Sequence, residues 1–256
     1  MILNLIESVG DKTIKKIISL YKLQVFSFIC LLHILQPSSY NATMKISLVK
    51  NIFHTSIRSL PIFSVLALVL GSFIIGVVIS MATKFNLQTQ IGSIIISFVV
   101  NEFSPLFTVF FIAIHSKILF DIKLDNENMR DEEYIVNNIV LPRVISGVLS
   151  TISLSIILSL LMLVSGYVFT YFFMGMDLHT YKQLLFDALN LGNVILLFFK
   201  SITFGLALTL IPIYNSLKIQ NTSFVKKSSP FSVLVKLFFA IFFIELASLL
   251  FVSLIS

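Results

Sequence analysis

The sequence has little charge for its length. Charged residues make up 12% of its 256 positions, whereas hydrophobic residues make up 57% and the mean hydropathy is +1.00. A soluble domain carries about 25% charged residues. The chain therefore lacks the polar side chains that would cover a water-facing surface, and we expect it to lie in a lipid bilayer.

Other scarce features exclude further classes of protein. The one cysteine, Cys30, rules out an internal disulfide and a cysteine-based metal site, so we expect it to be a small apolar filler. The four histidines stand in separate segments without metal-ligand spacing, which predicts no metal site. No phosphate-binding glycine loop and no G-x-S-x-G motif occurs, so neither P-loop ATP hydrolysis nor serine-hydrolase chemistry is expected. We read the net charge of +6 as topology-setting charge near an anionic leaflet, and expect no nucleic-acid partner.

The N-terminal region is predicted to lie along the membrane surface. Residues 3–35 combine a basic face with apolar residues at helical spacing, and their apolar run is too short to cross a core about 30 Å thick. Residues 44–58, MKISLVKNIFHTSIR, form a second short basic amphipathic segment. We therefore divide the chain into an interfacial region, 1–58, and a five-helix membrane domain, 59–256.

Five apolar runs are near or above the roughly 20 residues that a membrane-spanning helix requires. They cover residues 61–82, 91–115, 143–173, 194–216 and 231–255. The predicted fold class is an all-α membrane protein with an N-terminal interfacial amphipathic helix, five transmembrane helices, and a cytoplasmic amphipathic loop between the second and third.

The distribution of lysine and arginine predicts the orientation of these spans. Seven precede the first span, and the successive loops hold one, four, one and three. The positive-inside rule places the N-terminus in the cytoplasm and the C-terminus on the outer side.

The loop at residues 117–140 is the only strongly polar stretch. It can be a solvated connector or a docking element for a cytoplasmic partner. We favour docking, because five spans contain no machinery for using chemical energy. The residues that we single out for this role are Asp121, Asp125, Glu127 and Arg130.

Three ionisable residues fall inside the predicted spans, namely Glu102, Lys200 and Glu245. A charge at the centre of a span costs about 2.5–3.5 kcal/mol on insertion scales, so such residues usually face a bundle interior or a polar cavity and are often paired. They can form an ion pair that locks helices together or a polar site along a substrate path, and we favour the path. Asn101 belongs to the same candidate network, and Pro105 is expected to kink the second span.

The order of these segments resembles the MlaE-type permeases, the membrane subunits of ABC transporters that work with MCE proteins. NEFSPLFTVFFIAIHS (101–116) resembles the Glu-x-x-Pro segment of the second span in that family. LPRVISGVLS (141–150) is similar to its Pro-Arg-x-x-x-Gly motif, and FFKSITFGLALTLIPIYNS (198–216) to its Lys-Ser-x-x-Phe-Gly motif. Glu245 stands where the family usually has an acid. Asn101 stands where the family usually has a basic residue, so Glu102 must be paired with Lys200, hydrated or protonated.

The resemblance implies a homodimeric permease of the bacterial inner membrane with its C-terminus in the periplasm. A separate cytoplasmic ATPase subunit would bind ATP and magnesium, this chain would carry no cofactor and no enzyme activity, and a periplasmic MCE-domain protein would lie above. The expected function is movement of phospholipid or a related hydrophobic lipid between the inner and outer membranes. The alternatives are the same architecture with another hydrophobic cargo, an intramembrane lipid enzyme, or a membrane scaffold that transports nothing.

Overall fold

The structure is a bundle of long helices, and the predicted fold class is confirmed. The computed structural model describes residues 14, 18, 21–34, 36, 42–115, 135–220 and 230–255, and every regular element among them is helical. Five of these helices are long and apolar enough to cross a membrane. The labelled elements are α2 (Ala42–Ile52), η2 (Phe53–Ile57), α3 (Leu60–Lys84), η3 (Gln88–Gln90), α4 (Ile91–Ile95), η4 (Ile96–Phe103), α5 (Ser104–His115), η7 (Val136–Val140), α7 (Leu141–Met174), α8 (Leu178–Ala188), α9 (Leu191–Gln220) and α10 (Pro230–Ile255).

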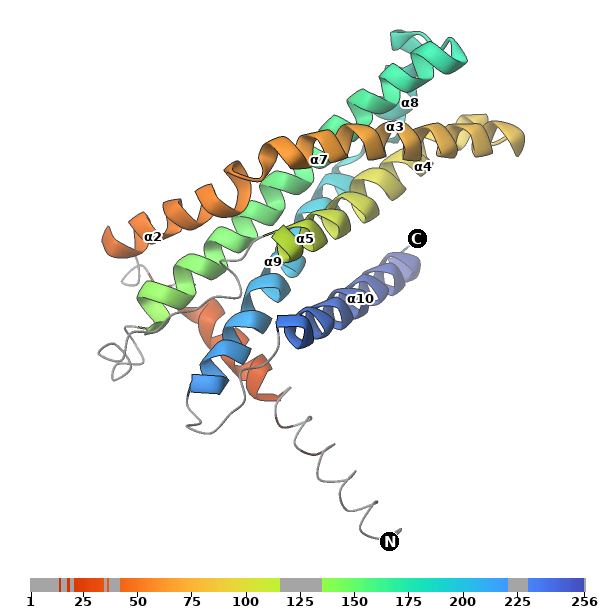
Figure 1. Ribbon diagram of the computed structural model, residues 1–256. Coiled ribbons are helices and arrows are strands. Elements are labelled where there is room, and N and C mark those ends of the chain that lie inside the picture. The colour runs from red at the N-terminus through yellow and green to blue at the C-terminus, as the bar shows by residue number, and fades with distance from the viewer. Residues whose placement is uncertain are drawn as a thin grey trace, which may run out of the picture.

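The first span is the second part of a longer, interrupted helix. α2 passes through the π-helical segment η2 into α3, and the run from Ala42 to Lys84 has 43 residues. At 1.5 Å per residue it measures roughly 60 Å, about twice the thickness of a hydrocarbon core. The predicted amphipathic segment 44–58 is therefore joined to the first span as one interrupted helix, which changes direction after α2 (Figure 1).

The third span, α7, is the centre of the bundle. It packs against α2, α3, α5 and α9, and one row of its residues is buried along most of its length. Its 34 residues measure about 50 Å, so it projects beyond a hydrocarbon core or crosses it at a tilt. Every other span is therefore positioned, directly or through a neighbour, by this one helix.

Glycine allows α7 to approach its two main neighbours closely. A methyl group added at Gly71 of α3 would lie 2.5 Å from the Cα atom of Met162. One added at Gly205 of α9 would lie 2.8 Å from the Cα atom of Val148. Both distances are shorter than a carbon–carbon contact, so the two helix pairs can adopt this spacing only because these positions lack a side chain.

The end of the bundle away from α2 contains a helix that we did not predict. Residues 174–193 were expected to be a loop, but α8 occupies Leu178–Ala188 and packs on α4. Asp177 begins this helix, because its carboxylate accepts hydrogen bonds from the Thr180 hydroxyl and the His179 backbone N–H. α8 lies at the opposite end of the molecule from α2 (Figure 1).

The apolar helix Tyr21–Ile34 packs beside the other end of the bundle. Cys30 is 1% exposed and contacts the buried cluster formed by Val140, Val144, Leu210 and Ile213. This cysteine is an apolar packing residue, as its isolation in the sequence predicted. Most of the predicted helix at residues 3–20 lies outside the described residues.

Candidate functional site

The three ionisable residues of the spans meet in one cluster. Lys200 lies on α9 and its side chain is 1% exposed. Its Nζ forms ion pairs with Glu102 Oε2 on η4 and with Glu245 Oε1 on α10, the latter at 3.2 Å. The cluster thus joins the second, fourth and fifth spans, and we call it the acid–lysine–acid cluster.

An irregular helix presents Glu102 to this cluster. The second span consists of α4, the eight-residue π-helical segment η4, and α5. Ser104 donates from both its backbone N–H and its hydroxyl to the Val99 carbonyl, which closes the wide turn just before Pro105. Pro105 has no N–H to donate, so the chain before it cannot continue a regular α-helical ladder. A π-helical turn changes the direction of the side chains that follow it, and here it accompanies the acid that reaches Lys200.

Glu245 connects the least buried of the five spans to the cluster. Only 17% of the most apolar stretch of the fifth span is buried, against 50% in the fourth. α10 lies along one side of the bundle next to α9, and it also contacts α5 through Phe238 and Phe110, whose ring centroids are 5.5 Å apart (Figure 1). The ion pair with Lys200 acts together with the buried side chains of Leu237 and Ile241, and with the hydrogen bond from Lys236 Nζ to Asn215 Oδ1 at 2.7 Å, to fix α10 along α9.

The cluster is unbalanced in charge. Two carboxylates and one ammonium give a net charge of −1 when all three are ionised. Glu245 Oε2 is buried and makes no hydrogen bond within the described chain. A buried charge without a partner is costly, so the cluster favours the approach of a further cationic group. The arrangement can therefore hold helices together and also attract a positively charged ligand.

Asn101 makes a different contact from the one we expected. It was predicted to belong to the network of Glu102, but its side chain is 2% exposed and its Nδ2 donates to Asn193 Oδ1 at 2.9 Å. Asn193 in turn donates to the Ala188 carbonyl at the end of α8. Asn101 thus fixes the second span to the α8–α9 connection.

Two features of α9 were missed by sequence reasoning. The Thr151 hydroxyl donates to the Ser201 carbonyl at 2.9 Å, which ties α7 to α9 one residue from Lys200. Asn190 accepts a hydrogen bond from the Asn193 backbone N–H and caps α9, so the fourth span begins at Leu191, three residues earlier than predicted. An asparagine before an apolar run is a helix-start signal, and this second feature was therefore detectable.

The remaining predicted residues have no structural account. Asp121, Asp125, Glu127 and Arg130 lie outside the described residues, and of the loop 117–140 only its last six residues are described. Among the described residues, no group of three or more histidine, cysteine, aspartate or glutamate side chains is placed to hold a metal ion.

Fold and site together define the class of protein. It is an all-α membrane protein with five helices long and apolar enough to span a membrane and a partly buried polar cluster shared by three of them. The family model described as Permease MlaE matches residues 48–120 and 134–251, and the chain belongs to this family.

Curated relatives agree with this assignment. A "Probable ABC transporter permease protein" of Rickettsia bellii (strain RML369-C) is 21% identical over 230 residues, covering 84% of this chain and 85% of the relative. A protein of the same description from Rickettsia felis (strain ATCC VR-1525 / URRWXCal2) is 22% identical over 230 residues with the same coverage. The similarity extends over nearly the full length of both relatives.

Proposed function

We propose that this chain is the membrane permease subunit of an ABC transporter that moves phospholipid, or a related hydrophobic lipid, between the inner and outer membranes. The observation that carries the proposal is the match of a five-span chain to the MlaE permease family. Relatives described as probable ABC transporter permeases support the coarser part of it.

The chain's own composition supports a separate source of energy. The sequence contains no phosphate-binding glycine loop, so ATP hydrolysis belongs to a partner subunit that binds ATP and magnesium. The cytoplasmic loop 117–140 is the proposed docking element for that partner. On the other side of the inner membrane, a periplasmic MCE-domain protein would receive or deliver the lipid.

The exposed surface of α10 supports a hydrophobic cargo. Phe238, Phe239, Phe242 and Phe243 are all at least half exposed in the single chain. Two copies of the chain that face each other through the first, second and fifth spans would enclose an apolar cavity lined by such residues. Burial of a methylene group contributes about 0.8 kcal/mol, so an acyl chain would bind tightly there without polar contacts. Release then requires the cavity to collapse, and ATP-driven movement of the partner would supply that work.

The acid–lysine–acid cluster would stabilise one conformation of the transport cycle. Because it joins the second, fourth and fifth spans, its ion pairs fix the relative positions of helices that must move when the cavity changes volume. We favour this role over direct binding of a zwitterionic headgroup, which water solvates better than a buried site does.

Purification of the chain in mild detergent tests the proposal. We expect a nucleotide-hydrolysing subunit, a second copy of the chain and bound lipid to be recovered with it. Isolation of the chain without a nucleotide-hydrolysing companion and without an amphiphile would refute the transport function and favour a scaffold. Recovery of a hydrophobic compound other than phospholipid would change only the cargo.

A second test addresses the cluster within the assembled complex. In Glu102→Gln and Lys200→Met we expect lipid transfer, and its coupling to ATP hydrolysis, to fall at normal expression. Lys182→Gln is the control, because this exposed lysine lies on α8. Rates equal to wild type in both variants would refute a role of the cluster in the cycle while leaving the permease assignment intact.

A further inference from the structure

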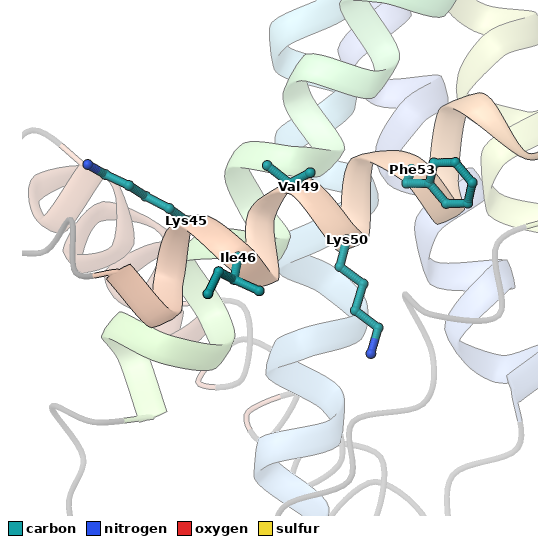
Figure 2. Close-up of a pocket in the computed structure, with 5 residues that line it drawn as sticks. All are labelled: Lys45, Ile46, Val49, Lys50 and Phe53. Carbon is teal, nitrogen blue, oxygen red and sulfur yellow. The ribbon is translucent and has the colours of Figure 1, made fainter.

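The open face of α2 combines two lysines with three apolar side chains. Lys45, Ile46, Val49, Lys50 and Phe53 line an open depression along this helix and the start of η2 (Figure 2). Ile46 is 70% exposed, Val49 65% and Phe53 51%. Apolar side chains with this exposure require an apolar environment that the chain itself does not provide.

The other face of α2 is already occupied. Met44 is fully buried, α2 packs along α7, and the Thr43 hydroxyl donates to Asn138 Oδ1 at 2.9 Å. The helix therefore cannot rotate to bury its open face against its own bundle without losing these contacts. The open face is a fixed feature of the fold.

The register places the lysines at the two edges of the apolar stripe. At 3.6 residues per turn, Val49, Phe53 and Ile46 lie side by side, with Lys45 on one edge and Lys50 on the other. The two lysine side chains extend to different sides of the helix (Figure 2). This pattern is typical of an interfacial helix. Its apolar stripe is buried among the upper parts of the acyl chains, and its lysine side chains extend to the lipid headgroups.

The length of α3 leaves α2 free to lie at the membrane surface. α3 alone has 25 residues, which measure about 38 Å, so it can cross a hydrocarbon core about 30 Å thick without α2. α2 precedes it by one short π-helical segment, and we infer that it lies at the headgroup level.

The segment that carries this face has no acidic residue of its own. Residues 42–58 contain no aspartate or glutamate, and in the described part of the chain neither Lys45 nor Lys50 forms an ion pair. The positive charges of Lys45 and Lys50 fit the phosphates of anionic lipids, and the stripe between them fits the upper part of the acyl chains.

We propose that the open face of α2 is a binding site for anionic phospholipid of the surrounding bilayer. Lys45 and Lys50 hold headgroup phosphates, and Val49, Phe53 and Ile46 contact the acyl chains below them. The bound lipid anchors α2 at a fixed depth and is distinct from any transported cargo, so the proposal does not depend on the proposed function.

Lipid retention by the full chain tests the site. The wild-type protein is placed in nanodiscs of equal parts phosphatidylglycerol and phosphatidylcholine. The lipids that remain bound when the protein is released from the nanodisc are identified and counted by native mass spectrometry. Each lysine near an anionic surface contributes about 1 kcal/mol of attraction, which corresponds to about a fivefold preference for an anionic lipid over a neutral one. We therefore expect phosphatidylglycerol to be enriched several-fold over its share of the nanodisc, and the enrichment to fall as salt is raised.

Matched variants distinguish lipid binding at this site from a general effect of the protein's positive charge. K45Q/K50Q should lose most of the enrichment, whereas K45R/K50R should keep it. K84Q/K182Q removes two exposed lysines at the α8 end of the molecule and should keep it as well. No enrichment in wild type, unchanged enrichment in K45Q/K50Q, or an equal loss in K84Q/K182Q would overturn the proposal.

A photoreactive amino acid at position 49 identifies the occupant directly. Cross-links to phosphatidylglycerol support the site, and their yield should fall several-fold when Lys45 and Lys50 are both replaced by glutamine. Cross-links to a second copy of the chain in place of lipid would show that the face is a protein interface and would overturn the proposal.

Discussion

Replacement of Lys200 by methionine removes the cation that joins Glu102 and Glu245 while keeping a flexible side chain of similar length. The two carboxylates then face each other without a counter-ion in a partly buried position. Two carboxylates that have lost their shared counter-ion destabilise the folded state.

The structure sets the size of this effect. Lys200 Nζ lies 3.2 Å from Glu245 Oε1, so at an effective dielectric constant of about 20 this pair alone has a gross attraction of about 5 kcal/mol. Desolvation of the buried ammonium offsets part of that attraction. Removal of one partner of a buried pair typically costs about 3–5 kcal/mol. At about 2–4 °C per kcal/mol for a chain of this size, we expect Lys200→Met to lower the melting temperature by roughly 6–20 °C.

The single cysteine provides the assay. Cys30 is 1% exposed, so a thiol-reactive dye reports its exposure on heating in detergent, and the loss of the folded peak in size-exclusion chromatography gives a second measure. Glu102→Gln and Glu245→Gln are the matched variants, because each leaves one lysine and one acid in balance and should cost less than Lys200→Met. The triple variant E102Q/K200M/E245Q removes every charge and should recover most of the loss. A melting temperature of Lys200→Met within about 2 °C of wild type, or no recovery in the triple variant, would refute this account of the cluster.

Three further predictions concern the fold and its orientation. The hydrogen bond from the Thr180 hydroxyl holds the pKa of Asp177 below its usual range, so its cap of α8 should persist at neutral pH and be lost only as pH falls through that depressed pKa. Hydrogen exchange should show a frayed first turn of α8 in Asp177→Ala and an intact one in Asp187→Ala; equal protection in both would contradict the capping role. Gly71→Leu should lower the yield of folded protein and the melting temperature by well over 5 °C, because an added Cβ would clash with the backbone of α7, whereas Gly192→Ala should be tolerated. Reporter fusions should be active at the N-terminus in the cytoplasm and at the C-terminus in the periplasm, and the reverse pattern would refute the orientation derived from lysine and arginine.

The spans could be predicted because the signal for them is strong and local. Each needs about 20 consecutive apolar residues, and an α-helix satisfies all backbone polar groups of such a run within the segment itself. The ends of the helices were harder to predict. α9 begins three residues before the predicted start because Asn190 caps it, and α8 was missed because its eleven residues mix polar and apolar side chains.

The candidate site could be predicted only as a set of residues. A charge within a span is costly wherever it lies, so Glu102, Lys200 and Glu245 stood out in the sequence. Whether they meet depends on how the second, fourth and fifth spans pack, and no local pattern specifies that packing. Asn101 illustrates the limit, since it neighbours Glu102 in sequence but bonds to Asn193. The functional role of these residues stays a prediction.

The acid–lysine–acid cluster also restricts the order in which related sequences can change. If either acid is lost first, Lys200 and the remaining acid form a neutral pair, and the lysine can be lost in a later step with the second acid. If the lysine is lost first, two bare carboxylates remain in an apolar setting. Descendants of this chain are therefore expected to pass through intermediates with one acid and one lysine, and ancestral reconstructions that place a lysine-free, two-acid form between them should yield a poorly folded protein.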